Sequence, residues 1–168
     1  QQNNANADVA SEDASSAVAL AASAKVHSVV SIGVQSKLDI DLVPKGEYTF
    51  GKNTASVVVT TNNRSGYSLY VKMAGEEQAL TSSDTTITGQ INPVSGTVTE
   101  ADFATEANKD TWGYNLTAGE TAGTSYTAVP KNSDTAAATV TDSASTKTSY
   151  TLAFGTAVSQ ELPAGTYT

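Results

Sequence analysis

The chain has 168 residues, a formal net charge of −8 at pH 7 and no cysteine, a length that suits one domain or one domain with an arm. It contains a single arginine, Arg64, so it lacks the clustered basic side chains that bind nucleic acid or anionic membranes. Without disulfides, its stability must come from the core, a metal, an isopeptide crosslink or assembly.

Residue usage favours strands over helices. The apolar residues are mainly valine, alanine, leucine and isoleucine, and threonine and serine are abundant. β-Branched residues such as valine and threonine favour the pleated surface of a sheet. Residues that favour helices, such as Glu, Lys, Arg and Gln, are scarce after Lys25. The composition therefore predicts an all-β fold.

Residues 1–25 differ from the rest, because alanine and serine dominate and large apolar residues such as Val18 and Leu20 are few. Alanine favours a helix, whereas the interspersed serines favour caps and turns. We interpret this segment as an arm that is flexible or becomes ordered only against a partner. Residues 26–168 are then predicted to form one β-domain.

From Val26 onward the apolar residues alternate along the chain. Val26, Val30, Ile32 and Val34 are separated by two or four positions, with Ser28 between the first two, which places them on one face of a predicted strand. A second alternating run covers residues 38–42, with two aspartates facing water.

Further short strands are separated by turn signals rich in glycine, proline and asparagine. We expect them at residues 55–61, 67–73, 85–90, 111–116, 126–130, 137–141 and 149–158. Because helices do not alternate with strands, this pattern predicts an antiparallel β-sandwich, immunoglobulin-like or pilin-like.

The two ends of the sequence lead to two predictions, one about export and one about the edge of the sheet. The chain begins at Gln1 with neither Met nor a signal peptide, which indicates a processed, exported protein. A turn at residues 162–165 is followed only by residues 166–168, so we expect an incomplete sheet edge at the C-terminus. A strand donated by a neighbouring subunit can complete such an edge, and residues 26–34 are the expected donor. The alternative is a chain that simply ends early.

Residues for catalysis or metal binding are sparse. His27 is the only histidine, so a Ser-His-Asp triad or a multi-histidine zinc site cannot form without it. Asp39 and Asp41 share a strand face and could contribute to a Ca²⁺ site, but EF-hand spacing is absent. A surface histidine and a solvated strand face are the favoured interpretations. We expect a protein that is not an enzyme and binds no cofactor or metal.

Two hypotheses concern crosslinking and ligand contact. Lys37 could donate an intramolecular isopeptide bond with Asp39 as the nearby acid, but the strand at residues 149–158 contains no asparagine to accept it. Trp112 and Tyr114 could stack on a sugar or contact a protein ligand. The favoured interpretation is that Trp112 and some of the tyrosines fill the core, because the chain has few other large residues that could do so.

Several short motifs occur in an order that resembles a group of secreted bacterial surface proteins, found in Gram-positive and Saccharibacteria-like genomes. The matching pieces are residues 55–63 (ASVVVTTNN), 66–69 (GYSL), 111–114 (TWGY), 126–130 (YTAVP), 154–155 (FG) and 162–168 (LPAGTYT). The resemblance implies a cell-surface β-sandwich with one more strand after the last motif. It does not cover residues 1–25.

These observations favour a structural subunit of an extracellular, pilus-like fibre or surface coat. Copies of the chain would assemble by strand donation, with Val26, Val30, Ile32 and Val34 filling a neighbour's groove. The alternative is a monomeric adhesin that binds a host or cell-surface glycan or protein through Trp112 and Tyr114. Neither hypothesis involves nucleic acid or insertion into a membrane.

Overall fold

The computed structural model describes residues 2–9, 18–34, 38–142 and 146–168, and these are mostly β, which confirms the prediction of an all-β fold. The strands are β1 (Gln2–Val9), β2 (Val18–Lys25), β3 (Val30–Val34), β4 (Tyr48–Thr61), β5 (Tyr67–Leu69), β6 (Leu80–Thr81), β7 (Gln90–Pro93), β8 (Val98–Thr99), β9 (Thr111–Ala118), β10 (Ser125–Tyr126), β11 (Ala138–Val140) and β12 (Thr146–Ser159). Two short helices, α1 (Glu100–Phe103) and the 3₁₀ helix Glu106–Asn108, lie between β8 and β9.

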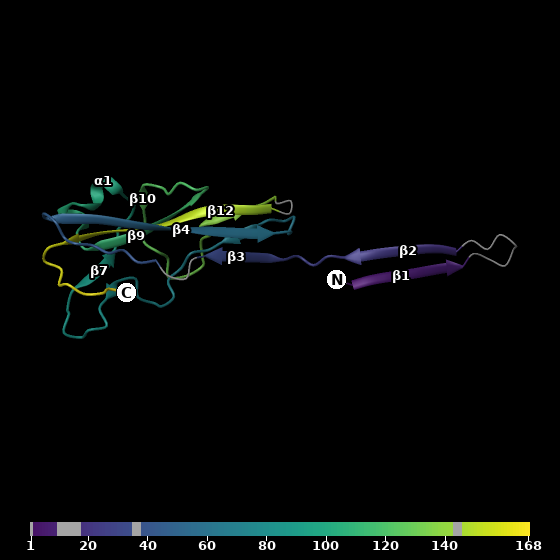
Figure 1. The fold of residues 1–168 in the computed structure, drawn as a ribbon, viewed down its shortest axis with the longest axis horizontal. Helices are drawn as coiled ribbons and strands as arrows, with labels where there is room; N and C mark the ends of the chain where they lie inside the picture. Colours follow the sequence, from purple (N-terminus) through teal and green to yellow (C-terminus); the bar gives the residue numbers. More distant parts are fainter. Residues whose placement is uncertain (1, 10–17, 35–37, 143–145) are drawn as a thin grey trace.

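A six-stranded sheet with the order β3-β4-β12-β9-β7-β6 forms the body of the molecule (Figure 1). Its centre is the antiparallel pair of β4 and β12, which is in register from Tyr48–Ser159 to Thr61–Thr146. The other neighbours are also antiparallel, except for β7 and β9, which run parallel. Two small sheets, β5-β11 and β8-β10, complete the body.

One face of the sheet, which we call the β5 face, packs against β5 and β11. Val57 and Val59 of β4 and Tyr150 of β12 are buried there with Leu69 of β5. Tyr150 is the cross-strand partner of Val57, and directly opposed residues lie on the same face. Further along this face, a second apolar cluster surrounds Trp112.

The opposite face, which we call the α1 face, packs against α1, β8 and β10. Phe50, Phe103 and Tyr126 form an aromatic cluster there, and the rings of Phe103 and Tyr126 meet edge to face with centroids 5.4 Å apart. Gly113 and Gly155 are cross-strand partners beneath Tyr126, and a Cβ on Gly155 would lie 2.8 Å from the Tyr126 ring. The paired glycines therefore make room for the buried tyrosine.

Several predicted strands are shorter than expected or absent. The strand expected at residues 26–34 begins only at Val30, and residues 38–42 form no strand. Instead of pairing in the plane of the sheet, Ile40 and Leu42 lie over Gly51 of β4, whose missing side chain leaves them space. The expected strand at 67–73 ends at Leu69, and the one at 85–90 is replaced by β7, which begins only at Gln90.

The N-terminal segment forms a β-hairpin that the sequence analysis did not predict. Strands β1 and β2 pair antiparallel from Gln2–Lys25 to Val9–Val18. In the described part of the chain, no ladder joins either strand to another sheet. The hairpin projects from one end of the body, roughly in line with β3 (Figure 1). Residues 1 and 10–17 of the predicted arm lie outside the described residues.

Candidate interaction surface

An apolar row on β3 is the most prominent exposed feature of the sheet. Val30, Ile32 and Val34 are 54%, 57% and 53% exposed, and we call them the β3 row. Ile32 and Val34 are the cross-strand partners of Val59 and Val57, so the row continues the β5 face. Those partners on β4 are only 2% and 4% exposed. The apolar β5 face of the sheet therefore continues onto β3, one strand beyond the buried residues of β4.

The β5-β11 sheet packs over β4 and β12 but does not extend over β3. Leu69, Tyr67 and Ala138 of the β5-β11 sheet pack against the cluster that contains Val57, Val59 and Tyr150. All five residues of β3 are exposed. A contiguous exposed apolar surface at a sheet edge is typical of an interaction site.

The link between the hairpin and β3 is held by the turn after β4. The Asn62 backbone N–H donates to the Val29 carbonyl (3.3 Å), and the Val29 N–H donates to Asn62 Oδ1 (2.7 Å). Asn62 Nδ2 also donates to the His27 carbonyl (3.1 Å), and Thr61 Oγ1 donates to the Val29 carbonyl (3.0 Å). These bonds hold His27 and Val29 beside the end of β4.

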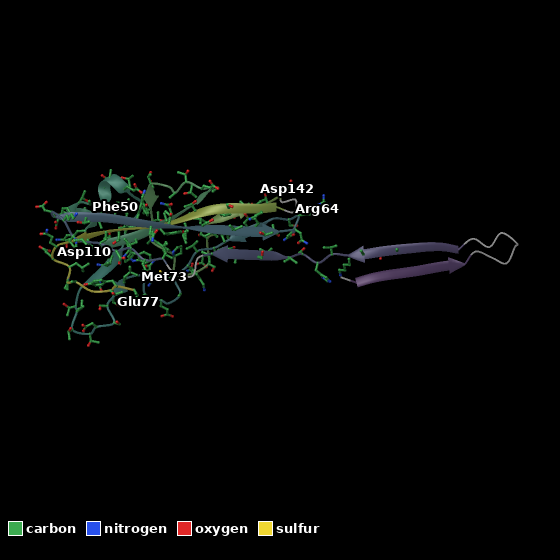
Figure 2. The ribbon with its side chains drawn as sticks, in the orientation of Figure 1. Phe50, Arg64, Met73, Glu77, Asp110 and Asp142 are labelled. Carbon is green, nitrogen blue, oxygen red and sulfur yellow. The ribbon has the colours of Figure 1, made fainter. Side chains whose placement is uncertain are left out.

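Val26, the fourth predicted donor residue, precedes β3 and is exposed. It lines a shallow hollow of about 460 Å³ with Ser28, Asn62, Asn63 and Arg64. Figure 2 shows Arg64 and Asp142 at the end of the body from which the hairpin leaves. The structure therefore brings Val30, Ile32 and Val34 together in one row and places Val26 beside the base of the hairpin.

Trp112 and Tyr114, the candidate ligand-contact aromatics, lie on β9 in the cluster on the β5 face. Trp112 is 8% exposed, its Nε1 donates to the Gln78 carbonyl (2.7 Å), and its ring lies 6.0 Å from that of Phe154 between centroids. Tyr114 is half-buried in the same cluster, and burial raises its pKa. Such an enclosed indole ring presents little surface on which a ligand can stack.

The other candidate residues are dispersed. His27 is exposed in the link before β3, and Asp39 and Asp41 are exposed in the segment that precedes β4. The Asp39 carbonyl accepts a hydrogen bond from Asn53 (2.7 Å). Lys37, the candidate isopeptide donor, lies outside the described residues. Within the described ranges, no three His, Cys, Asp or Glu side chains gather as a metal site would require.

None of the helices in the described part of the chain is long and apolar enough to cross a membrane.

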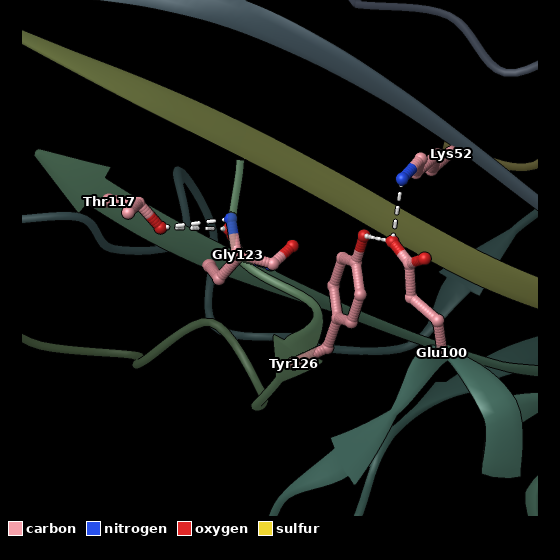
Figure 3. A network of polar contacts seen from close by, with 6 residues as sticks. Lys52, Glu100, Thr117, Gly123 and Tyr126 are labelled. Carbon is pink, nitrogen blue, oxygen red and sulfur yellow. Dashed lines mark hydrogen bonds and ion pairs between the residues drawn. The ribbon is translucent and has the colours of Figure 1, made fainter. Parts of the chain in front are cut away.

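The sequence patterns did not predict a polar network on the α1 face, because its residues are far apart from one another in the sequence. Glu100 of α1 accepts from the Tyr126 hydroxyl (2.9 Å) and from Lys52 Nζ (2.8 Å) (Figure 3). Lys52 lowers the pKa of the Glu100 carboxyl, while burial and the bond to Glu100 raise the pKa of Tyr126. Beside it, the Gly123 N–H donates to Thr117 Oγ1 (3.0 Å). This network anchors α1 and β10 to the sheet.

The far edge of the sheet carries the last residues of the chain. Tyr167 forms an antiparallel bridge with Ser82, and Thr81 and Thr168 exchange backbone hydrogen bonds of 3.2 and 3.0 Å. These residues therefore continue the sheet beyond β6.

Comparison of the chain with protein-family models, with curated proteins and with solved structures finds no match.

Proposed function

We propose that this chain is a structural subunit of an extracellular fibre or surface coat, which assembles with copies of itself by strand donation at the β3 edge of the sheet. The observation that carries the proposal is the β3 row, where Val30, Ile32 and Val34 prolong the buried β5 face into solvent. Covering an apolar surface removes it from water, which stabilises an assembly by roughly 25 cal/mol per Å².

The proposal includes the finer architecture of an immunoglobulin-like or pilin-like sandwich. The packing of the β5-β11 sheet on one face of the six-stranded sheet supports it. It also includes secretion and the absence of enzymatic activity, for which the acidic, serine- and threonine-rich composition and the dispersed candidate residues are the support.

The alternative, a monomeric adhesin that uses Trp112 and Tyr114, has less support. The Trp112 ring is enclosed in a core cluster and its N–H is bound to the Gln78 carbonyl. A sugar-binding platform needs an accessible aromatic face, which this ring does not offer.

The proposal is tested by placing a charge in the β3 row. Ile32→Asp should abolish filaments in negative-stain electron microscopy and shift the sedimentation coefficient to that of the monomer. The monomer itself should stay folded, with a change in the free energy of unfolding of less than about 1 kcal/mol, because Ile32 is already more than half exposed.

Val43→Asp is the matched control. Val43 is 74% exposed, and it precedes Tyr48, which begins β4 at the end opposite to Thr61, the partner of Val30. This variant adds the same charge to another exposed valine and should leave assembly intact. Filaments that persist in Ile32→Asp, or that are lost equally in both variants, would contradict a role for the β3 row.

A further inference from the structure

The strand that carries the β3 row is also an open edge of the six-stranded sheet. Within the described part of the chain, β4 is the only strand that pairs with β3. Natural edge strands are commonly protected by charged residues, proline or a bulge. The sequence of β3, VSIGV, contains no charge and no proline, and its register with β4 runs without a bulge. β3 therefore lacks the features that keep the sheets of two molecules apart.

The backbone groups that point away from β4 belong to the β3 row itself. The Asn62 N–H donates to the Val29 carbonyl, so Val29 is turned toward β4. In an antiparallel pair, residues turned toward the neighbouring strand alternate with residues turned away from it. Ser31 and Gly33 are therefore turned toward β4, and the three residues of the β3 row are turned outward. Each of these three offers an N–H donor and a C=O acceptor to a further strand.

The β3 row is symmetric about Ile32, which makes it complementary to itself. Val30 and Val34 stand two residues before and two residues after Ile32. If a second β3 runs antiparallel with Ile32 opposite Ile32, Val30 of each copy lies opposite Val34 of the other. Directly opposed residues share one face of a sheet, so both apolar rows meet on the same face. This register pairs every outward residue of the row, whereas a shift by two residues leaves one valine of each copy unpaired.

The charges at the two ends of β3 favour the antiparallel orientation. Basic residues outnumber the acid near its N-terminal end, where the structure places Lys25, Arg64 and Lys147 together with Asp142 (Figure 2). Beyond its C-terminal end lie two exposed acids, Asp39 and Asp41, and the Asp39 carbonyl is bound to Asn53 of β4.

Antiparallel pairing of two β3 strands brings the basic end of each copy beside the acidic segment of the other. Parallel pairing would bring like charges together. Complementary charges of this kind set the orientation and register of a contact more than its affinity. A second copy of the chain therefore fits this edge in shape, hydrogen bonding and charge.

We infer that β3 of one copy pairs antiparallel with β3 of a second copy, about a two-fold axis that passes between their Ile32 residues. This inference rests on the proposed function, since it specifies how copies meet at the β3 edge. β3 is then donor and acceptor at once, whereas the sequence analysis gave it the role of donor alone. The contact is isologous and closes after two copies, so longer assemblies need a further contact on another surface.

The full-length chain contains no cysteine, so single cysteine variants test the register directly. In this pairing the two Ile32 Cα atoms lie about 5.5 Å apart, a separation that a disulfide spans. The two Val30 Cα atoms lie roughly 13 Å apart, because four residues at about 3.3 Å each separate their positions. We expect oxidised Ile32→Cys to form at least tenfold more disulfide dimer than Val30→Cys alone or Val34→Cys alone.

A mixture of the two control variants completes the register test. Val30→Cys mixed with Val34→Cys should crosslink as efficiently as Ile32→Cys, because Val30 of one copy lies opposite Val34 of the other. Non-reducing electrophoresis measures all four reactions. Crosslinking of Val30→Cys alone at the level of Ile32→Cys would overturn the antiparallel register.

A pair of charged variants keeps the test independent of thiol chemistry. The double variant Val30→Lys, Val34→Asp places unlike charges opposite each other across the two-fold axis, and Val30→Lys, Val34→Lys places like charges there. Unlike charges directly across two strands attract and like charges repel. Sedimentation velocity should give a dimer dissociation constant at least tenfold lower for the first variant. Both positions are more than half exposed, so each monomer should stay folded.

The outcomes separate this inference from the proposed function. Wild-type filaments in which neither the Ile32→Cys crosslink nor the mixed crosslink forms would overturn the inference, since another segment then occupies the β3 edge, and would leave the proposed function standing. A dimer with both crosslinks that assembles no further would support the inference and contradict the fibre or coat. A wild-type protein that stays monomeric would overturn both.

Discussion

Trp112, an aromatic residue that could have contacted a ligand, packs in the core of the protein. Its indole ring packs with Ile91, Val129 and Val158, and its N–H satisfies the Gln78 carbonyl. Truncating it would leave a cavity on the β5 face and an unpartnered carbonyl. The ring therefore contributes to stability, at a position for which the sequence favoured a core role over a ligand contact.

We expect Trp112→Ala to lower the free energy of unfolding by about 3–5 kcal/mol. Tyr70→Ala, which truncates an aromatic residue that is 46% exposed, should lower it by less than about 1 kcal/mol. Urea denaturation followed by circular dichroism measures both. A stable, folded Trp112→Ala protein would contradict the core assignment and revive the ligand-contact hypothesis.

Two buried tyrosines, Tyr126 and Tyr150, make the stability of the fold depend on pH in alkaline solution. Burial and the hydrogen bond to Tyr67 (2.6 Å) raise the pKa of Tyr150 from 10.0 to about 12, and burial and Glu100 raise the pKa of Tyr126 in the same direction. A raised pKa means that the folded state keeps a proton that the unfolded state releases. Stability is therefore fully present below pH 10 and is lost as the pH rises above it.

We expect the free energy of unfolding to fall by up to about 3 kcal/mol between pH 10 and 12 on account of Tyr150. Denaturation at a series of pH values measures this slope, and Tyr150→Phe, which cannot ionise, should show a smaller one. Equal slopes in the two proteins would mean that Tyr150 titrates alike when folded and unfolded.

At the scale of elements, the turn between β4 and β5 decides how the second layer meets the sheet. Gly66 lies in this turn with φ 81°, and a Cβ there would lie 1.7 Å from the Val140 carbonyl oxygen of β11. The backbones of the turn and of β11 therefore approach more closely than any side chain permits.

Gly66→Ala should destabilise the fold by more than Gly46→Ala, which serves as its matched control. Gly46 also has a positive φ, 68°, but a Cβ there meets no atom within 4 Å. We expect about 1–2 kcal/mol for the conformational strain of Gly46→Ala and a further 1–3 kcal/mol, roughly, for the clash in Gly66→Ala. Thermal unfolding measures both, and equal losses would show that the contact with β11 relaxes freely.

At the scale of the whole molecule, charge opposes assembly while apolar contact favours it. Each copy carries a net charge of −8, so copies repel one another at low ionic strength. The β3 row consists of valine and isoleucine, and burying it does not depend on attraction between charges. Salt should therefore relieve the repulsion without weakening the contact.

We expect the protein concentration needed for half-maximal assembly to fall at least threefold when salt is raised from about 10 to 150 mM, because the screening length shrinks from roughly 30 to 8 Å. Light scattering or sedimentation velocity measures this concentration. Assemblies that dissolve as salt is added would show that ion pairs, and not the apolar row, hold the copies together.

Local patterns in the sequence were sufficient to predict an all-β fold, the positions of its central strands and the apolar face of residues 30–34. Alternation and turn residues act within a few positions along the chain, so they can be read without knowing what packs nearby. The prediction of a strand at residues 38–42 was wrong. The side chains of Ile40 and Leu42 lie over the sheet at Gly51, a residue distant in sequence that has no side chain to exclude them.

Only the tertiary structure decided which apolar faces are covered. The same alternation describes Val57 and Val59, which are buried, and Val30 and Ile32, which face solvent. The difference lies in β5 and β11, which cover the first pair and stop short of the second. Coverage depends on contacts between residues far apart in the chain, and this is also why Trp112 lies in the core and why residues 2–9 pair with residues 18–25.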